Sequence, residues 1–260
     1  MNTQEYTHPN EIILSGKKGD TEQVKDSIKR LFGSHNKIVA FSGGADYNLE
    51  GISDKAIQDN YQKVMQTKEE HIIKEAICIL KDYNVVILSG GTKWGVPKTA
   101  ATEAKKYGLK TIGIYPLRGR KHALGKDILD LAICVEPYYG ESEWGDESPI
   151  FAQFLDAVIV YAGGAGTLIE IAHTLKINED IVKKKKQAYE IGDSEDISAD
   201  KRITTKYIVP ISGTGGVADG LPFIWSKTEV RNASIPRQRV SGGKEAAYIL
   251  IDRLNLDYQG

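Results

Sequence analysis

The sequence has few cysteines, almost no net charge and no long apolar run. Two of its 260 residues are cysteine, and no cysteine or histidine spacing resembles a zinc site, so we expect no metal and no cofactor. Lysine and arginine number 34 against 35 aspartate and glutamate, which provides no general electrostatic footprint for nucleic acid or an anionic membrane. No run reaches the length of a membrane span, and residues 1–6 lack a signal pattern. These absences predict a cytoplasmic protein without a nucleic-acid or membrane partner.

What is present is enough apolar sequence, 41% of the residues, to form the core of a large α/β domain. Residues 1–36 are mostly polar, and we interpret them as an N-terminal extension with one amphipathic helix. The apolar residues of this helix recur at helical spacing, and Gly33 ends it. They are Val24, Ile28, Leu31 and Phe32. Residues 37–260 are expected to form a single Rossmann-like nucleotide-binding domain.

From residue 37 onward, short apolar runs alternate with helical patterns. The expected strands are residues 38–41, 85–88, 111–115, 132–135, 157–161 and 207–211. Continuous apolar strands separated by helices indicate a parallel sheet that is covered on both faces. The predicted fold is therefore α/β, with a doubly wound, mostly parallel, Rossmann-like sheet and an N-terminal helical extension.

Glycine turns follow several of these strands. They include Gly43 and Gly44, then Gly90, Gly91 and Thr92, and later residues 212–216. Ligands in such sheets bind at the carboxyl ends of the strands, where these turns lie. The glycines let a backbone approach a ligand, or they simply make tight turns between a strand and a helix.

The most informative turn follows the strand at residues 157–161. It contains Gly163, Gly164, Gly166 and Thr167, and it opens a helix whose first turn is expected to carry Glu170. A helix start offers unpaired N–H groups and a positive dipole end, which suits a phosphate. The pattern predicts a nucleotide or sugar-phosphate ligand. Glu170 is then a candidate for catalysis, or an acid that complements the helix dipole.

The sequence from Gly163 to Glu170 resembles the P-G-G-x-G-T-x-x-E signature of the Lonely-Guy family. Those proteins are cytokinin-nucleotide phosphoribohydrolases within the SLOG superfamily of Rossmann-like nucleotide binders. Residues 88–96 are similar to the family's earlier G-G-x-x-G-x-M segment, and the likeness covers roughly residues 37–225.

The resemblance implies a role for each matching residue. Gly163, Gly164, Gly166 and Thr167 would bind the ligand phosphate. Gly90, Gly91 and Thr92 would form the opposing wall. Glu170 would assist cleavage of the N-glycosidic bond by stabilising an oxocarbenium-like sugar and activating water.

Two departures from the family pattern affect this interpretation. Ala162 stands where the family has proline, and residues 145–151 are acidic where the family carries an arginine-lysine pair. Either another cation such as Arg118 or Arg120 substitutes, or the protein binds a nucleotide without that chemistry.

The loop at residues 138–147 supplies candidates for contact with a base or ribose. They are Glu143, Trp144, Asp146 and Glu147. The alternative is a solvated acidic loop with one packed tryptophan. Arg118, after the strand at 111–115, is a candidate phosphate ligand or an ordinary surface charge.

Residues 183–206 are polar and indicate either a flap over the site or a solvated helix end and loop. Two functions stay open. The first is a phosphoribohydrolase acting on a nucleoside 5′-monophosphate. The second is a non-catalytic sensor or carrier of a nucleotide, such as a signal derived from NAD or ADP-ribose. A homo-oligomer is expected from the family resemblance.

Overall fold

The computed structural model describes residues 8–17, 19–34, 36–44, 53–190, 204–224 and 227–259. Its seven-stranded sheet is parallel throughout, with the strand order β1-β5-β4-β3-β2-β6-β7. The strands are β1 (Glu11–Leu14), β2 (Lys37–Gly43), β3 (Val85–Ser89), β4 (Lys110–Pro116), β5 (Leu131–Val135), β6 (Ala157–Tyr161) and β7 (Tyr207–Pro210). The predicted doubly wound, Rossmann-like fold is confirmed, and each of the six expected strands is present.

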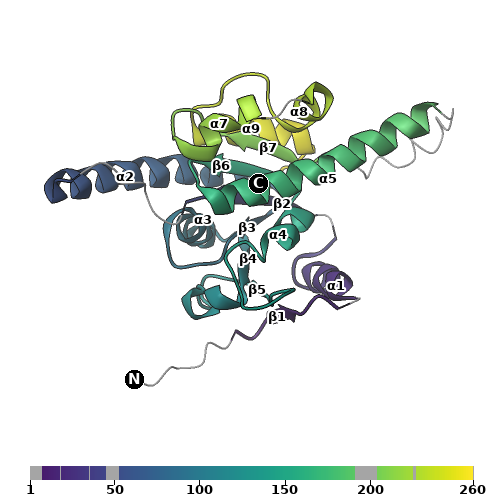
Figure 1. Cartoon of the computed structure of the whole chain (residues 1–260), viewed down its shortest axis with the longest axis horizontal. Coiled ribbons are helices and arrows are strands. Elements are labelled where there is room, and N and C mark those ends of the chain that lie inside the picture. The colour runs from purple at the N-terminus through teal and green to yellow at the C-terminus, as the bar shows by residue number, and fades with distance from the viewer. Residues whose placement is uncertain are drawn as a thin grey trace.

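Helices cover both faces of the sheet (Figure 1). They are α1 (Asp20–Phe32), α2 (Lys55–Leu80), α3 (Gly95–Lys106), the 3₁₀ helix η1 (Leu117–His122), α4 (Ser148–Phe154), α5 (Ala165–Glu190), α7 (Gly216–Ile224), α8 (Thr228–Ser234) and α9 (Gly243–Leu254). Side chains of α2, α3 and α9 pack on one face with Val39 and Phe41. Those of α1, α4, α5, α7 and α8 pack on the other with Ile38 and Ala40. Alternate residues of β2 thus enter opposite cores, as the twofold strand period requires.

The N-terminal residues contribute a strand as well as the predicted helix. β1 pairs with β5 at the edge of the sheet, and its Ile12 and Leu14 are buried. The Glu11 carboxylate lies 2.6 Å from an Arg120 guanidinium nitrogen and accepts a hydrogen bond from the Tyr115 hydroxyl. This four-residue strand was not predicted, because its single apolar run is too short to stand out from the polar sequence around it.

The order of the strands reverses beside β2. From β2 the chain builds β3, β4 and β5 toward one edge, and it then returns to place β6 on the other side of β2. The helix after β2 covers one face and the helix after β6 covers the other. This is the switch point at which ligands bind in open α/β sheets. In the register, Gly43 at the end of β2 lies opposite Tyr161 at the end of β6.

Two long helices extend beyond the sheet in opposite directions, as Figure 1 shows for α2 and α5. The polar segment expected from residue 183 begins as helix, because α5 continues to Glu190. Lys183–Lys186 are exposed on it, which matches the solvated-helix-end interpretation for those four residues. The acidic stretch at 192–196 lies outside the described residues. Among the described helices, none combines the length and apolar character needed to cross a bilayer.

The two cysteines are free thiols, and Cys134 is buried in β5. Burial and the nearby Glu11 carboxylate raise the pKa of the Cys134 thiol to about 12. A thiol that stays protonated at neutral pH is a poor nucleophile. This agrees with the interpretation of Cys134 as a small buried apolar residue rather than a reactive group.

Candidate functional site

The turn after β6 requires glycine at one position for geometric reasons. Gly163 has φ +95°, and a Cβ added there would lie 2.5 Å from the Thr167 hydroxyl oxygen. Thr167 itself is buried under the turn. Gly164, Ala165 and Gly166 are exposed, and no atom obstructs the space beside Gly164 or Gly166. The turn therefore presents bare backbone at the switch point.

The N-terminus of α5 presents open hydrogen-bond donors. The carbonyls of Ala162 and Gly163 each accept a 3.0 Å hydrogen bond from the start of α7. By contrast, within the described part of the chain the N–H groups of Gly166 and Thr167 have no partner. Such donors at a helix start form an anion site. The tertiary contacts hold the turn by its carbonyl side and leave its donor side open.

Ala162 has a left-handed backbone, with φ +46°. Its N–H donates a 2.9 Å hydrogen bond to the Thr214 hydroxyl in the turn after β7. Proline has no N–H and fixes φ near −65°, so it could do neither. The replacement of the family proline thus changes the backbone at the head of the turn.

Glu170 lies in the second turn of α5, which corrects the expected position in the first turn. The helix begins at Ala165, because the preceding two glycines belong to the turn. The dipole effect falls off within the first turn, so it explains Glu170 poorly. Its carboxyl group instead faces β2 and accepts a hydrogen bond from the Ser42 hydroxyl.

The environment of Glu170 favours its protonated form. The pKa of its carboxyl group is raised to about 8, chiefly by burial and to a lesser extent by the nearby Glu147 carboxylate, whereas the Ser42 hydrogen bond lowers it. Burial also raises the pKa of Glu147, although Gly145 donates a 2.9 Å backbone hydrogen bond to its carboxylate. At neutral pH this environment therefore favours the protonated carboxyl group, which can donate a hydrogen bond.

The acidic loop at residues 138–147 joins β5 to α4, and its side chains contact η1 and α5. Arg118 forms an ion pair with Glu143, and its guanidinium carbon lies 5.9 Å from the Trp144 ring centre. The Asp146 carboxylate accepts a 2.8 Å hydrogen bond from the Glu143 backbone N–H and so closes the loop. A Cβ at Gly145 would lie 3.3 Å from the Ile169 side chain, which places this end of the loop beside α5.

The four base and ribose candidates therefore occupy different settings. Glu143 forms an ion pair with Arg118, and the Asp146 carboxylate accepts a hydrogen bond from the backbone of the same loop. Glu147 acts electrostatically on Glu170, where the family carries an arginine-lysine pair. Trp144 keeps 49% of its surface exposed, so the part of its ring that Arg118 does not cover can stack on a ligand. Contact of any of these residues with a ligand stays a prediction.

The Gly90-Gly91-Thr92 turn contacts the two residues that follow η1. The Gly91 carbonyl accepts a 2.8 Å hydrogen bond from the Leu124 N–H, and Thr92 is buried and pairs with Ala123. Gly91 has φ +64°, and a Cβ there would lie 2.8 Å from the Gly113 Cα. These contacts fit a tight-turn role for Gly91.

The glycines at the end of β2 are also closely packed. A Cβ at Gly43 would lie 2.5 Å from the Tyr161 carbonyl oxygen, and the Gly44 carbonyl accepts a 3.2 Å hydrogen bond from the Val96 N–H. Gly43 and Gly44 nevertheless lie directly beside the Ser42–Glu170 contact. Their contact with a ligand, like that of Gly90, Gly91 and Thr92, stays a prediction.

Both cations considered as substitutes for the family arginine have partners. Arg120 binds the Glu11 carboxylate of β1, and Arg118 binds Glu143. Among the described residues, no group of three or more histidine, cysteine, aspartate and glutamate side chains could hold a metal.

Two serines, one at the site and one next to the acidic loop, were not predicted. Ser42 was recognised only as part of a glycine turn, although a hydroxyl at a strand end beside a glycine pair is a usable signal. Ser148 is fully buried at the start of α4, and its hydroxyl has no partner among the described residues. Nothing in the local sequence distinguishes Ser148 from an ordinary helix-start serine.

A doubly wound parallel sheet with a glycine turn and an open helix N-terminus at its switch point defines a Rossmann-like protein. Residues 60–208 match the model of the SLOG cluster4 family, and the chain belongs to this family. No curated protein matched the sequence.

Solved structures share the fold. One is the X-ray structure of TM1055, a Northeast Structural Genomics Consortium target, at 17% identity and a TM-score of 0.51, covering 83% of this chain and 99% of that chain. Another is the molybdenum cofactor carrier protein of Chlamydomonas reinhardtii, at 16% identity and a TM-score of 0.51, covering 85% and 99%. At these identities the likeness establishes the architecture alone.

Proposed function

We propose that this protein binds a nucleotide-like phosphorylated small molecule, with its phosphate on the N-terminus of α5. The observation that carries this proposal is the pair of unpartnered N–H groups of Gly166 and Thr167 at the switch point. The exposed Trp144 ring is suited to stack on the base or another ring of the ligand.

We further propose that the ligand is carried or sensed at neutral pH without cleavage. An oxocarbenium-like transition state requires an ionised carboxylate, whereas burial raises the pKa of Glu170 to about 8. Arg118 and Arg120 are both paired with glutamates, so neither replaces the family arginine. The carrier role named for the Chlamydomonas protein is compatible with this proposal.

The second candidate is a phosphoribohydrolase. The observation in its favour is the position of Glu170 at the switch point, where the Ser42 hydroxyl orients its carboxyl group. If the Glu170 carboxyl group assists bond cleavage, the rate of base release by the protein rises as pH passes through about 8. The reason is that only the ionised carboxylate stabilises a cationic sugar.

One experiment separates the two. The protein is incubated at stoichiometric concentration with nucleoside 5′-monophosphates and ADP-ribose at pH 7 and pH 9, and released base is measured by chromatography while calorimetry measures binding. We expect binding at pH 7 and no released base at either pH. Release of base that is abolished by Glu170→Gln establishes the hydrolase and overturns the carrier.

A variant tests the phosphate site itself. Thr167→Val removes a hydroxyl from the turn at α5, and we expect it to weaken nucleotide binding about tenfold. Thr67→Val makes the same change on the exposed surface of α2 and serves as the control. Equal affinity in both variants contradicts a contact between the Thr167 hydroxyl and the phosphate.

We also propose a homo-oligomer built on the projecting half of α2. Its Ile57, Tyr61 and Val64 are 58%, 40% and 56% exposed at helical spacing, which forms one apolar stripe. The charge-introducing Tyr61→Glu is expected to reduce the mass measured by light scattering. An unchanged oligomeric mass excludes this stripe as the interface. Localisation in the cytoplasm stays a prediction.

A further inference from the structure

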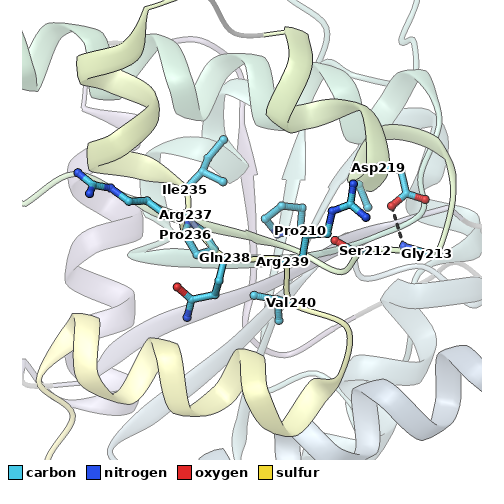
Figure 2. Close-up of a pocket in the computed structure, with 11 residues that line it drawn as sticks. Pro210, Ser212, Gly213, Asp219, Ile235, Pro236, Arg237, Gln238, Arg239 and Val240 are labelled. Carbon is cyan, nitrogen blue, oxygen red and sulfur yellow. Dashed lines mark hydrogen bonds between the residues drawn. The ribbon is translucent and has the colours of Figure 1, made fainter.

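A separate cavity of about 500 Å³ lies beside the edge strand β7. Its lining comes from the turn after β7, from the first turns of α7 and from the segment at residues 235–240. None of the residues of the α5 turn lines it, although Ser212 and Gly213 belong to the glycine turn after β7 that was expected at the ligand-binding edge of the sheet. The volume lies in the range of small-molecule sites. Figure 2 shows the side chains that surround it.

The walls of this cavity are held in place by the backbone. Val240 pairs with Ile211 in a parallel bridge, and its carbonyl accepts a 2.7 Å hydrogen bond from the Ser212 N–H. Ile235 is 4% exposed in the core at the other end of the segment. Because Ile235 and Val240 are both anchored, the residues between them line the cavity and do not fill it.

Two arginines and one carboxylate line the cavity, which leaves an excess of positive charge. Arg237 and Arg239 are exposed, and neither pairs with a carboxylate among the described residues. In Figure 2 Arg239 extends toward Ser212 and Asp219, whereas Arg237 extends toward the opposite end. Lys68 adds a third cation at the rim, where its ammonium group donates a 2.6 Å hydrogen bond to the Gly213 carbonyl.

The carboxylate that lines the cavity is already engaged. Asp219 accepts hydrogen bonds of 2.7 and 2.8 Å from the backbone N–H groups of Gly213 and Gly215. It therefore stabilises the turn after β7 and does not form an ion pair with Arg239. The guanidinium group of Arg239 and the hydroxyl of Ser212 remain as donors on the same side of the cavity.

We propose that this cavity is a second ligand site, which binds a phosphorylated small molecule through Arg239 and Ser212. A planar guanidinium group matches two phosphate oxygens, and a hydroxyl supplies a further donor. Arg237 at the other end binds a second anionic group of the same ligand. The site does not depend on the proposed function, because it shares none of the residues of the α5 turn.

The test uses inorganic pyrophosphate and isothermal calorimetry on the full chain. Thr167→Val serves as the background, because it is expected to weaken the phosphate site at α5. In this background we expect Arg239→Gln to weaken pyrophosphate binding at least tenfold and Arg237→Gln to weaken it several-fold. Lys244→Gln removes one exposed cation from α9, outside the cavity, and is expected to leave the affinity unchanged.

Each outcome decides the proposal. It is overturned if the background protein does not bind pyrophosphate, or if Arg239→Gln binds as tightly as Lys244→Gln. Both arginines are exposed, so the variants are expected to fold, and equal melting temperatures verify this. Failure of this site leaves the α5 proposal intact, because that proposal is tested by Thr167→Val in the otherwise unchanged chain.

Discussion

The Ser42 hydroxyl at the end of β2 donates a hydrogen bond to the Glu170 carboxyl group on α5. These residues are 128 positions apart in the chain. Ser42 belongs to β2 and Glu170 to the helix after β6, and β2 and β6 are the neighbouring strands at the switch point. The contact places a titratable group beside the open N-terminus of α5. It also makes the protonation of Glu170 a property of the folded state.

The stability of the protein should depend on pH through Glu170. Its pKa is raised to about 8 in the folded state, so its contribution is fully present below the ordinary glutamate value of 4.5 and is lost as pH rises through about 8. We expect the free energy of unfolding to fall by roughly 2–3 kcal/mol between pH 5 and pH 9, after allowance for its partial exposure. Urea unfolding at several pH values measures this.

Glu170→Gln should remove most of that dependence, because an amide stays neutral. Glu229→Gln makes the same chemical change at an exposed position on α8 and should retain the wild-type slope. If Glu170→Gln also retains that slope, the carboxyl group of Glu170 is ionised in the folded protein.

Gly163→Ala should destabilise the protein by roughly 2–3 kcal/mol. The residue has φ +95°, and the new methyl group would collide with the Thr167 side chain. Gly164→Ala is the control, because no atom lies within 4 Å of a Cβ at that position. Thermal unfolding of both variants should separate them, and equal melting temperatures would show that the turn accommodates a side chain at Gly163.

Arg120→Ala should cost roughly 2–4 kcal/mol of stability. The Glu11 side chain is only 7% exposed, and without Arg120 it becomes a buried charge with no opposite charge beside it. Lys121→Ala removes the neighbouring exposed cation and should have little effect. The double variant Arg120→Ala with Glu11→Gln should recover part of the loss. Chemical unfolding that fails to recover any would mean that the charge of Glu11 is not the cause.

Arg118→Gln should expose the Trp144 ring of the acidic loop while it changes the free energy of unfolding of the protein only slightly. The Arg118–Glu143 pair is exposed, so its loss should cost less than about 1 kcal/mol. The guanidinium group also lies over Trp144, and its removal should increase quenching of that ring by acrylamide. The measurement requires Trp94→Phe and Trp225→Phe, which leave Trp144 as the sole tryptophan of the three. Unchanged quenching would contradict a role of Arg118 in covering the ring.

Local patterns in the sequence were enough to predict the strands and the glycine turn. Residues 157–161 form a continuous apolar run, and Gly163 follows it. Few backbone conformations other than a strand and a glycine turn suit this pattern, because the conformation of each residue is decided by its neighbours in the chain. The short strand β1 was missed, because its stability comes from pairing with β5 and from the Glu11–Arg120 ion pair. Both are contacts between residues more than 100 positions apart.

The candidate site divides in the same way. The sequence by itself determined the class of fold, the position of the glycine turn and the presence of Glu170 beside it. Only the tertiary structure decided that Glu170 faces Ser42 and that Arg239 lines a separate cavity. It also decided that Arg118 forms an ion pair with Glu143 and that Arg120 forms one with Glu11. The physical reason is that backbone conformation follows from local sterics and periodicity. Charge, burial and hydrogen-bond partners instead depend on which distant elements the sheet brings together.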